Sequence, residues 1–216
     1  MINNLAMDDF IAKAAENIEN FEFDKVKIWE DTIPLSGTIN LSVEGFDVEK
    51  YRETIEEFKK IQTNQFYYPA EKLHMTLLPN IKPEFFNKLM STEIEKILSR
   101  YKLSFEIMCA DFRNYSAMQI VAKPQFDMAK LRQELRDFIN PNRDEWNLYS
   151  NGFEGIGHIS IMRYLETPKI ELLHKAFARF NGSFGTIVPK TVNIIKLTSK
   201  TLAPGKFSII KEISLD

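Results

Sequence analysis

Two short segments of the chain place a histidine two residues before a hydroxyl side chain: His74-Met75-Thr76 and His158-Ile159-Ser160. In an extended strand, alternate side chains point to the same face. The histidine and the hydroxyl of each segment would therefore share one face, while the apolar middle residue would point to the other. We expect each strand to pack its apolar face and to present an imidazole and a hydroxyl on the opposite face.

This pair of side chains suits the cleavage of a phosphodiester. One group must take a proton from the attacking oxygen, and another must give a proton to the leaving oxygen. Histidine, with an unperturbed pKa of about 6.5, can do either near neutral pH. The hydroxyls of Thr76 and Ser160 would donate hydrogen bonds to the non-bridging oxygens, so that His74 and His158 flank the phosphorus without a metal. A single histidine on a strand is more often structural, but two matching segments favour a paired catalytic site.

The elements around the two segments follow the same order twice. Alternating hydrophobicity and helix-capping signals predict strand, helix, strand, helix and strand in each half. The predicted ranges are 37–43, 47–61, 72–78, 83–100 and 103–110 in the first half, and 117–122, 126–139, 157–164, 168–180 and 184–188 in the second. Two further strands, at 191–198 and 207–213, would close the sheet, with a turn at Pro204-Gly205 between them.

The repeated order indicates an internal duplication. His74 and His158 lie 84 positions apart, and the helix-opening Pro83 and Pro168 lie 85 positions apart. We therefore expect one domain over residues 35–216. Residues 1–34 would precede it as a helical extension and connector, with an amphipathic helix over residues 5–20.

The two segments resemble the signatures of the 2H phosphoesterase superfamily, in which a histidine is followed by any residue, Thr or Ser, and an apolar residue. His74-Met75-Thr76-Leu77 and His158-Ile159-Ser160-Ile161 both fit this signature. The resemblance spans roughly residues 35–216. It implies a bilobed α+β fold of duplicated β-α-β-α-β halves, whose antiparallel sheets face a central cleft. It also implies that the histidines act as general acid and base and that the hydroxyls bind the phosphate.

Members of this superfamily include cyclic phosphodiesterases, 2′-5′ RNA ligase-like proteins and enzymes that degrade 2′-5′ oligoadenylates or cyclic oligonucleotide signals. The resemblance implies a phosphoric diester hydrolase acting on a 2′,3′-cyclic phosphate, a 2′-5′ linkage or a cyclic oligonucleotide. Two alternatives stay open: an RNA end-joining ligase that uses the same site in reverse, and a non-catalytic nucleotide-binding module. The symmetry of the motifs also leaves open which histidine is the acid and which is the base.

Four further residues are candidates for substrate binding. Tyr68 precedes the first motif, and Trp146 and Tyr149 lie in the long segment before the second. Their rings could stack on a base, which typically contributes about 1–3 kcal/mol per base. Lys72 shares the face of His74 in strict alternation and could contact a phosphate. Selectivity is expected to reside in the long segment, residues 140–157.

Three other features are expected to be structural. By strict alternation Arg163 would lie on the face opposite His158, unless the strand has ended before it. The charged run from Lys130 to Asp137 would form the solvent-facing side of a helix. His174, the third histidine, lacks the motif and would lie on a helix surface.

The composition argues against several other functional classes. The formal net charge of −2 does not suit a protein that grips long nucleic acid, whereas a nucleotide or short oligonucleotide remains a suitable partner. The single cysteine, Cys109, allows no internal disulfide, and the usual zinc ligand motifs are missing. We therefore expect no metal and no cofactor. The sequence has no apolar run of membrane-spanning length, so we expect a cytoplasmic protein without membrane contact.

Overall fold

The computed structural model describes residues 36–111, 117–142, 153–179, 184–198 and 207–215. The helix predicted over residues 5–20 lies outside the described residues, as do Trp146 and Tyr149. Division of the chain into an extension over 1–34 and a domain over 35–216 therefore stays a prediction.

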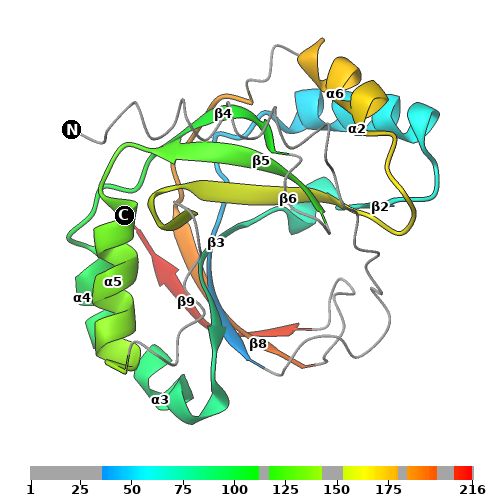
Figure 1. The fold of residues 1–216 in the computed structure, drawn as a ribbon. Helices are drawn as coiled ribbons and strands as arrows, with labels where there is room; N and C mark the ends of the chain where they lie inside the picture. The colour runs from blue at the N-terminus through cyan, green and yellow to red at the C-terminus, as the bar shows by residue number, and fades with distance from the viewer. Residues whose placement is uncertain (1–35, 112–116, 143–152, 180–183, 199–206, 216) are drawn as a thin grey trace.

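The described strands form two antiparallel sheets, which confirms the predicted α+β class (Figure 1). Sheet A has the order β3 (Met75–Ile81), β1 (Gly37–Leu41), β8 (Thr191–Leu197) and β9 (Phe207–Ser214). Sheet B has the order β2 (Phe66–Tyr67), β6 (Gly157–Arg163), β5 (Ala117–Pro124), β4 (Phe105–Asp111) and β7 (Thr186–Ile187). The two-residue strand β2 is not part of the sequence prediction.

The two sheets exchange strands between the halves of the chain. Strand β4, the last of the first half, pairs with β5 in sheet B. Strand β8, which follows the second half, pairs with β1 in sheet A. The orders β3-β1-β8-β9 and β6-β5-β4-β7 therefore correspond position by position, with a motif strand first in each. This correspondence supports the predicted duplication and shows that neither half builds its sheet alone.

Five α-helices accompany the sheets in the described part of the chain. They are α2 (Val48–Ile61), α3 (Phe86–Leu89), α4 (Thr92–Leu98), α5 (Met128–Ile139) and α6 (Ile170–Ala178). Asp47 caps α2, and Asp127 caps α5, because each carboxylate accepts a hydrogen bond from the backbone N–H three residues on, at 3.0 and 2.9 Å.

Two predicted helices are wrong in their limits. The single helix predicted over 83–100 is broken: Pro83 begins a short 3-10 turn, α3 ends at Leu89, and Ser91 caps α4 as a separate helix. Serine is a strong N-cap residue, since its hydroxyl accepts from a free backbone N–H at the helix start. Helix α6 begins at Ile170 rather than Pro168.

The helices form two groups (Figure 1). Helices α2 and α6 lie against each other, and α5 contacts both α3 and α4 on another side of the molecule. Phe58 of α2 stacks on Phe177 of α6 with a centroid distance of 6.5 Å. No helix in the described residues is long and apolar enough to cross a membrane.

One face of sheet A packs on α3. A Cβ atom added to Gly37 of β1 would lie 2.8 Å from the Phe86 ring and 3.1 Å from Leu89, so only glycine fits there. Ile39 and Leu41 share this face by alternation and are fully buried. We call it the helix face of sheet A and call the other, which carries the side chains of even-numbered β1 residues, the motif face.

Candidate active site

The first motif lies at the start of β3. His74 directly precedes the strand, and its Nδ1 lies 2.9 Å from the carbonyl oxygen of Lys72. Because a carbonyl can only accept, Nδ1 carries the hydrogen and Nε2 is the nitrogen left for a substrate. Thr76 lies two residues further on, beside Asn40 of β1, and its Oγ1 is 3.3 Å from Asn40 Oδ1.

The second motif lies within β6. His158 and Ser160 are partly exposed, whereas Ile159 between them is fully buried, as alternation predicts. Ser160 lies directly opposite Gln119 of β5. Each motif hydroxyl therefore faces a carboxamide on the neighbouring strand, Asn40 in sheet A and Gln119 in sheet B. Both carboxamides are buried, at 5% and 4% exposure.

The two motif strands meet at Gly157, the residue before His158. A Cβ atom on Gly157 would clash with the Met75 sulfur and lie 3.3 Å from the Phe105 ring. Met75 is the middle residue of the first motif, so the absence of a side chain at residue 157 lets β6 approach β3. The two strands belong to different sheets, and this approach brings their histidines together.

Arg132 of α5 links the two motif strands from inside the core. Its side chain is fully buried. The guanidinium donates to the carbonyl oxygens of Leu77 (2.9 Å) and Thr76 (3.4 Å) in β3. It also donates to those of Glu154 (2.8 Å) and Ile156 (3.1 Å), just before β6. One side chain thus fixes the first motif strand relative to the approach to the second.

The prediction that the run from Lys130 to Asp137 faces solvent is wrong for two of its residues. Arg132 and Arg136 are buried, at 0% and 4% exposure, and Arg136 pairs with the Glu154 carboxylate at 2.8 Å. A sequence signal for Arg132 exists: it lies four residues after Met128 and three before Leu135, which both belong to the buried face of the helix.

The strict-alternation prediction for Arg163 also fails, because β6 contains a β-bulge. Ser160 pairs with Gln119 and Met162 pairs with Met118, so Ile161 is the extra residue. Ile161 and Met162 are consecutive and both fully buried. The bulge reverses the side-chain alternation after Ile161. The partly exposed Arg163 therefore lies on the same face of the sheet as His158 and Ser160.

The charge of Arg163 acts on both histidines. Burial lowers the pKa of His74 and the Arg163 charge lowers it further, while the hydrogen bond to the Lys72 carbonyl acts in the opposite direction. Burial lowers the pKa of His158 to about 4, with further lowering by the charges of Arg132, Arg163 and His74. In both rings the neighbouring positive charge and the burial disfavour the protonated form.

The remaining predicted residues lie at the edge of this arrangement or outside the described residues. Tyr68 lies beside β6, and its hydroxyl accepts a hydrogen bond from Arg163 Nε at 3.2 Å. Lys72 ends a short 3-10 turn before β3, so its exposed side chain does not belong to the strand alternation. His174 lies in α6, as predicted.

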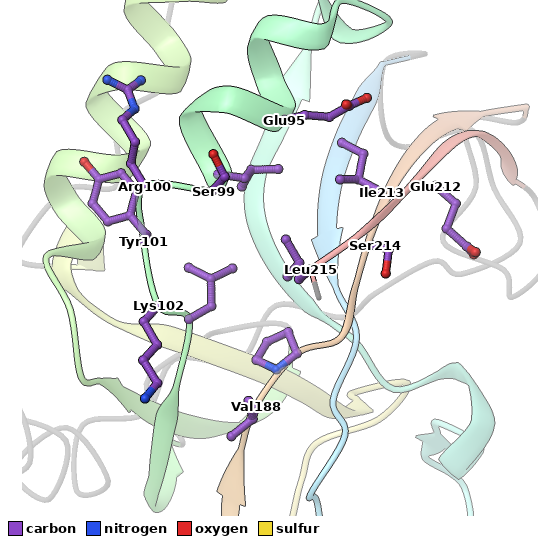
Figure 2. Close-up of a pocket in the computed structure, with 13 residues that line it drawn as sticks. Glu95, Ser99, Arg100, Tyr101, Lys102, Val188, Glu212, Ile213, Ser214 and Leu215 are labelled. Carbon is purple, nitrogen blue, oxygen red and sulfur yellow. The ribbon is translucent and has the colours of Figure 1, made fainter.

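A cavity of about 770 Å³ lies elsewhere, between the end of α4 and the end of β9 (Figure 2). Arg100, Tyr101, Ile213 and Leu215 are among the residues that line it, and neither motif contributes to it. Its separation from the histidines gives it no part in the chemistry of the motifs. Within the described ranges, no three His, Cys, Asp or Glu side chains cluster in a way that could hold a metal ion.

The arrangement of the chain is similar to that of several solved structures. Escherichia coli LigT complexed with NADP+ matches at 13% identity and a TM-score of 0.49, over 85% of this chain and 99% of LigT. The same protein complexed with ATP matches at 14% identity and a TM-score of 0.48, over 84% and 98%. Usb1 of Kluyveromyces marxianus matches at 9% identity and a TM-score of 0.45, over 83% and 96%.

No protein-family model matches the sequence, and no curated protein matches it either. The predicted α+β fold is confirmed, because the two antiparallel sheets each carry one motif strand. Identities this low concern the fold alone, so the chemistry of the site rests on its own residues.

Proposed function

We propose that this protein is a metal-independent phosphodiesterase that cleaves a nucleotide phosphodiester by two-histidine acid–base catalysis. The observation that carries the proposal is the meeting of the two motif strands. Strands β3 and β6 come from different sheets, yet they lie together so that His74 and Arg163 both act on the pKa of His158. Two proton-transfer groups, two hydroxyls and a cation on one small site form the set that a phosphodiester requires.

The environments of the histidines favour different roles for them. His158, with a pKa of about 4, is neutral at pH 7 and is suited to take the proton from water or a ribose hydroxyl. His74 donates from Nδ1 to the Lys72 carbonyl, a hydrogen bond that favours its protonated form. We therefore assign His158 as the general base and His74 as the general acid that protonates the leaving oxygen from Nε2.

The negative charge of the phosphodiester allows His74 to hold the proton that a general acid needs. A phosphodiester anion between the two imidazoles raises the pKa of both, because it stabilises each protonated ring. His74 then binds a proton while His158 stays neutral. Arg163 and the hydroxyls of Thr76 and Ser160 would hold the non-bridging oxygens as negative charge builds up on them.

The substrate class follows from the resemblance of the motifs: a 2′,3′-cyclic phosphate, a 2′-5′ linkage or a cyclic oligonucleotide. The hydrogen bond from Arg163 Nε to the Tyr68 hydroxyl supports Tyr68 as a contact to the base. Lys72, Trp146 and Tyr149 remain proposed contacts to the rest of the substrate.

A substrate panel tests the proposal. Purified protein is assayed against 2′,3′-cyclic nucleotides, 2′-5′ and 3′-5′ dinucleotides, cyclic dinucleotides, and RNA with 2′,3′-cyclic phosphate and 5′-hydroxyl ends. The His74→Ala/His158→Ala double variant serves as the control. We expect cleavage of at least one phosphodiester that the double variant does not cleave. Joining of the RNA ends would instead indicate the ligase, and tight binding without turnover of any substrate would indicate a binding module.

A further inference from the structure

A row of polar side chains crosses sheet A from the first motif to the far edge. The antiparallel register places Thr76 of β3 opposite Asn40 of β1, Asn40 opposite Asn193 of β8, and Asn193 opposite Glu212 of β9. Directly opposed residues in antiparallel strands point to the same face. We call these four residues the polar row.

The polar row lies on the motif face, away from the helices. The neighbouring row shows this: Ile194 opposes Lys211, whose ammonium donates to the Met90 and Ser91 carbonyls at 3.3 Å, between α3 and α4. Lys196, two residues along from Ile194, lies 5.7 Å from the Phe86 ring centroid. Residues of the polar row alternate with these and therefore point to the other side. In β9, Glu212 and Ile213 leave the strand in different directions (Figure 2), and both are among the residues that line the cavity beside α4.

Asn193 has an unused hydrogen-bonding group on this face. Its Oδ1 is buried, and no described residue donates a hydrogen bond to it. Buried polar atoms in folded proteins normally have a partner, so an acceptor without one marks a position that a ligand can satisfy. The nearby Ser42 hydroxyl differs, because it accepts from the Thr191 backbone N–H at 3.0 Å and donates to Glu44.

The length of the row exceeds a phosphate group. Neighbouring strands lie about 4.8 Å apart, which places Asn193 about 10 Å and Glu212 about 14 Å from Thr76. A phosphate held by Thr76 cannot span this distance, but the sugar and base attached to it can. Asparagine offers both a donor and an acceptor, and glutamate offers acceptors, which together match ribose hydroxyls and the polar edges of a base.

We propose that the polar row is the subsite for the nucleoside attached to the reacting phosphate, with Asn193 as its central hydrogen-bonding residue. This inference rests on the proposed function for the position of the phosphate. Asn40 connects the two parts of the site, since it contacts Thr76 on one side and lies beside Asn193 on the other. The row runs over sheet A and does not include the long segment before the second motif.

Calorimetry with two ligands, one with and one without a nucleoside, tests the subsite by the affinity of each. The full chain is titrated with adenosine 3′-monophosphate and, separately, with inorganic phosphate. We expect Asn193→Leu to weaken binding of the nucleotide about tenfold, the effect of one or two neutral hydrogen bonds, and to leave phosphate binding unchanged. Glu212→Gln, an exposed change that keeps the shape of the side chain, should weaken only nucleotide binding in the same way.

The control is Lys196→Gln, on the same strand as Asn193 but on the helix face, which should change neither affinity. Equal weakening of both ligands by Asn193→Leu, or no weakening of either, would overturn the subsite. The outcome is independent of turnover. If wild-type protein cleaves no phosphodiester but Asn193→Leu still selectively loses the nucleotide, the subsite stands and the hydrolase proposal fails.

Discussion

In the absence of substrate, both histidines of the site favour the neutral form. Burial lowers the pKa of each, and His158 reaches about 4, so neither carries much charge at neutral pH. A general acid must hold a proton, and the proposed site gains one when the anionic substrate enters. The resting protein thus keeps two uncharged imidazoles beside Arg163, and the phosphate changes their protonation when it binds.

Arg163 is expected to be a main electrostatic control on both rings. Arg163→Gln removes a positive charge that disfavours imidazolium, so the pKa of both His74 and His158 should rise. NMR titration of the two ring C–H signals measures each value. Lys169→Gln, which alters an exposed cation on another part of the surface, is the matched control. Unchanged titration of both rings in Arg163→Gln would contradict an effect of the Arg163 charge on them.

The lowered pKa of His158 also predicts a stability effect with a defined sign. Well above pH 6.5 the ring is neutral in the folded and unfolded states and has no influence on stability. As pH falls toward 4, the unfolded state takes up the proton first, so folded protein loses stability. Between pH 8 and pH 5 this loss amounts to about 2 kcal/mol.

His158→Gln removes that proton uptake. Chemical denaturation at pH 8 and pH 5 should show the variant gaining about 2 kcal/mol relative to wild type at the lower pH. Protonation of carboxylates affects both proteins and cancels in this comparison. A difference between the two proteins that does not change with pH would mean that His158 titrates normally.

At the scale of elements, the closeness of β3 and β6 depends on Gly157. Gly157→Ala places a methyl group against the fully buried Met75 side chain, so we expect the two motif strands to move apart. Because small errors in the placement of catalytic groups are costly, we expect kcat to fall at least tenfold. Steady-state kinetics measures this effect.

A second substitution that removes the clash with Met75 tests whether that clash causes the loss of kcat. Gly157→Ala combined with Met75→Ala removes the colliding side chain and should recover part of the lost kcat, even though Met75→Ala alone lowers stability. If the double variant is no faster than Gly157→Ala, steric separation of the strands is not the reason for the loss.

Helix α5 contributes the side chain that ties the motif strands together. Arg132→Met leaves four carbonyl oxygens without this donor, and the hydrogen bonds to two of them, Leu77 and Ile156, are buried. Each buried group that finds no other partner costs about 1–3 kcal/mol. We expect the free energy of unfolding to fall by at least about 2 kcal/mol. Urea denaturation measures it, and Lys130→Met, an exposed change on the same helix, should have little effect. Equal stability of the two variants would contradict the role of Arg132.

The sequence predicts individual elements better than the details that break their regularity. Period-two alternation finds the motif strands, because His158 and Ser160 do share a face. It fails at Arg163, since a single extra residue in β6 moves every later side chain to the opposite face of the sheet. No pattern in the local sequence indicates this bulge. The position of Arg132 on the buried face of its helix can be predicted from the sequence, but the carbonyls that accept its hydrogen bonds come from distant segments.

At the scale of the whole molecule, the duplication is visible in the sequence but the exchange of strands is not. The repeated order and the 84-residue offset concern neighbours along the chain, whereas β4 and β8 each join the sheet of the other half through long-range pairing. Neither sheet is complete without both halves. The candidate site lies where the first strand of one sheet meets the corresponding strand of the other, so it exists only in the assembled fold.

The account depends most on two histidines that act together without a metal. The most direct measurement is kcat/KM in excess EDTA, on a substrate found in the panel, for wild type, His74→Ala, His158→Ala and the double variant. We predict that EDTA leaves wild-type activity unchanged and that each single change lowers kcat/KM by about 10²–10⁴-fold, the usual contribution of a general acid or base. Near-normal turnover by either single variant, or activity lost in EDTA and restored by a divalent metal, would contradict the central claim.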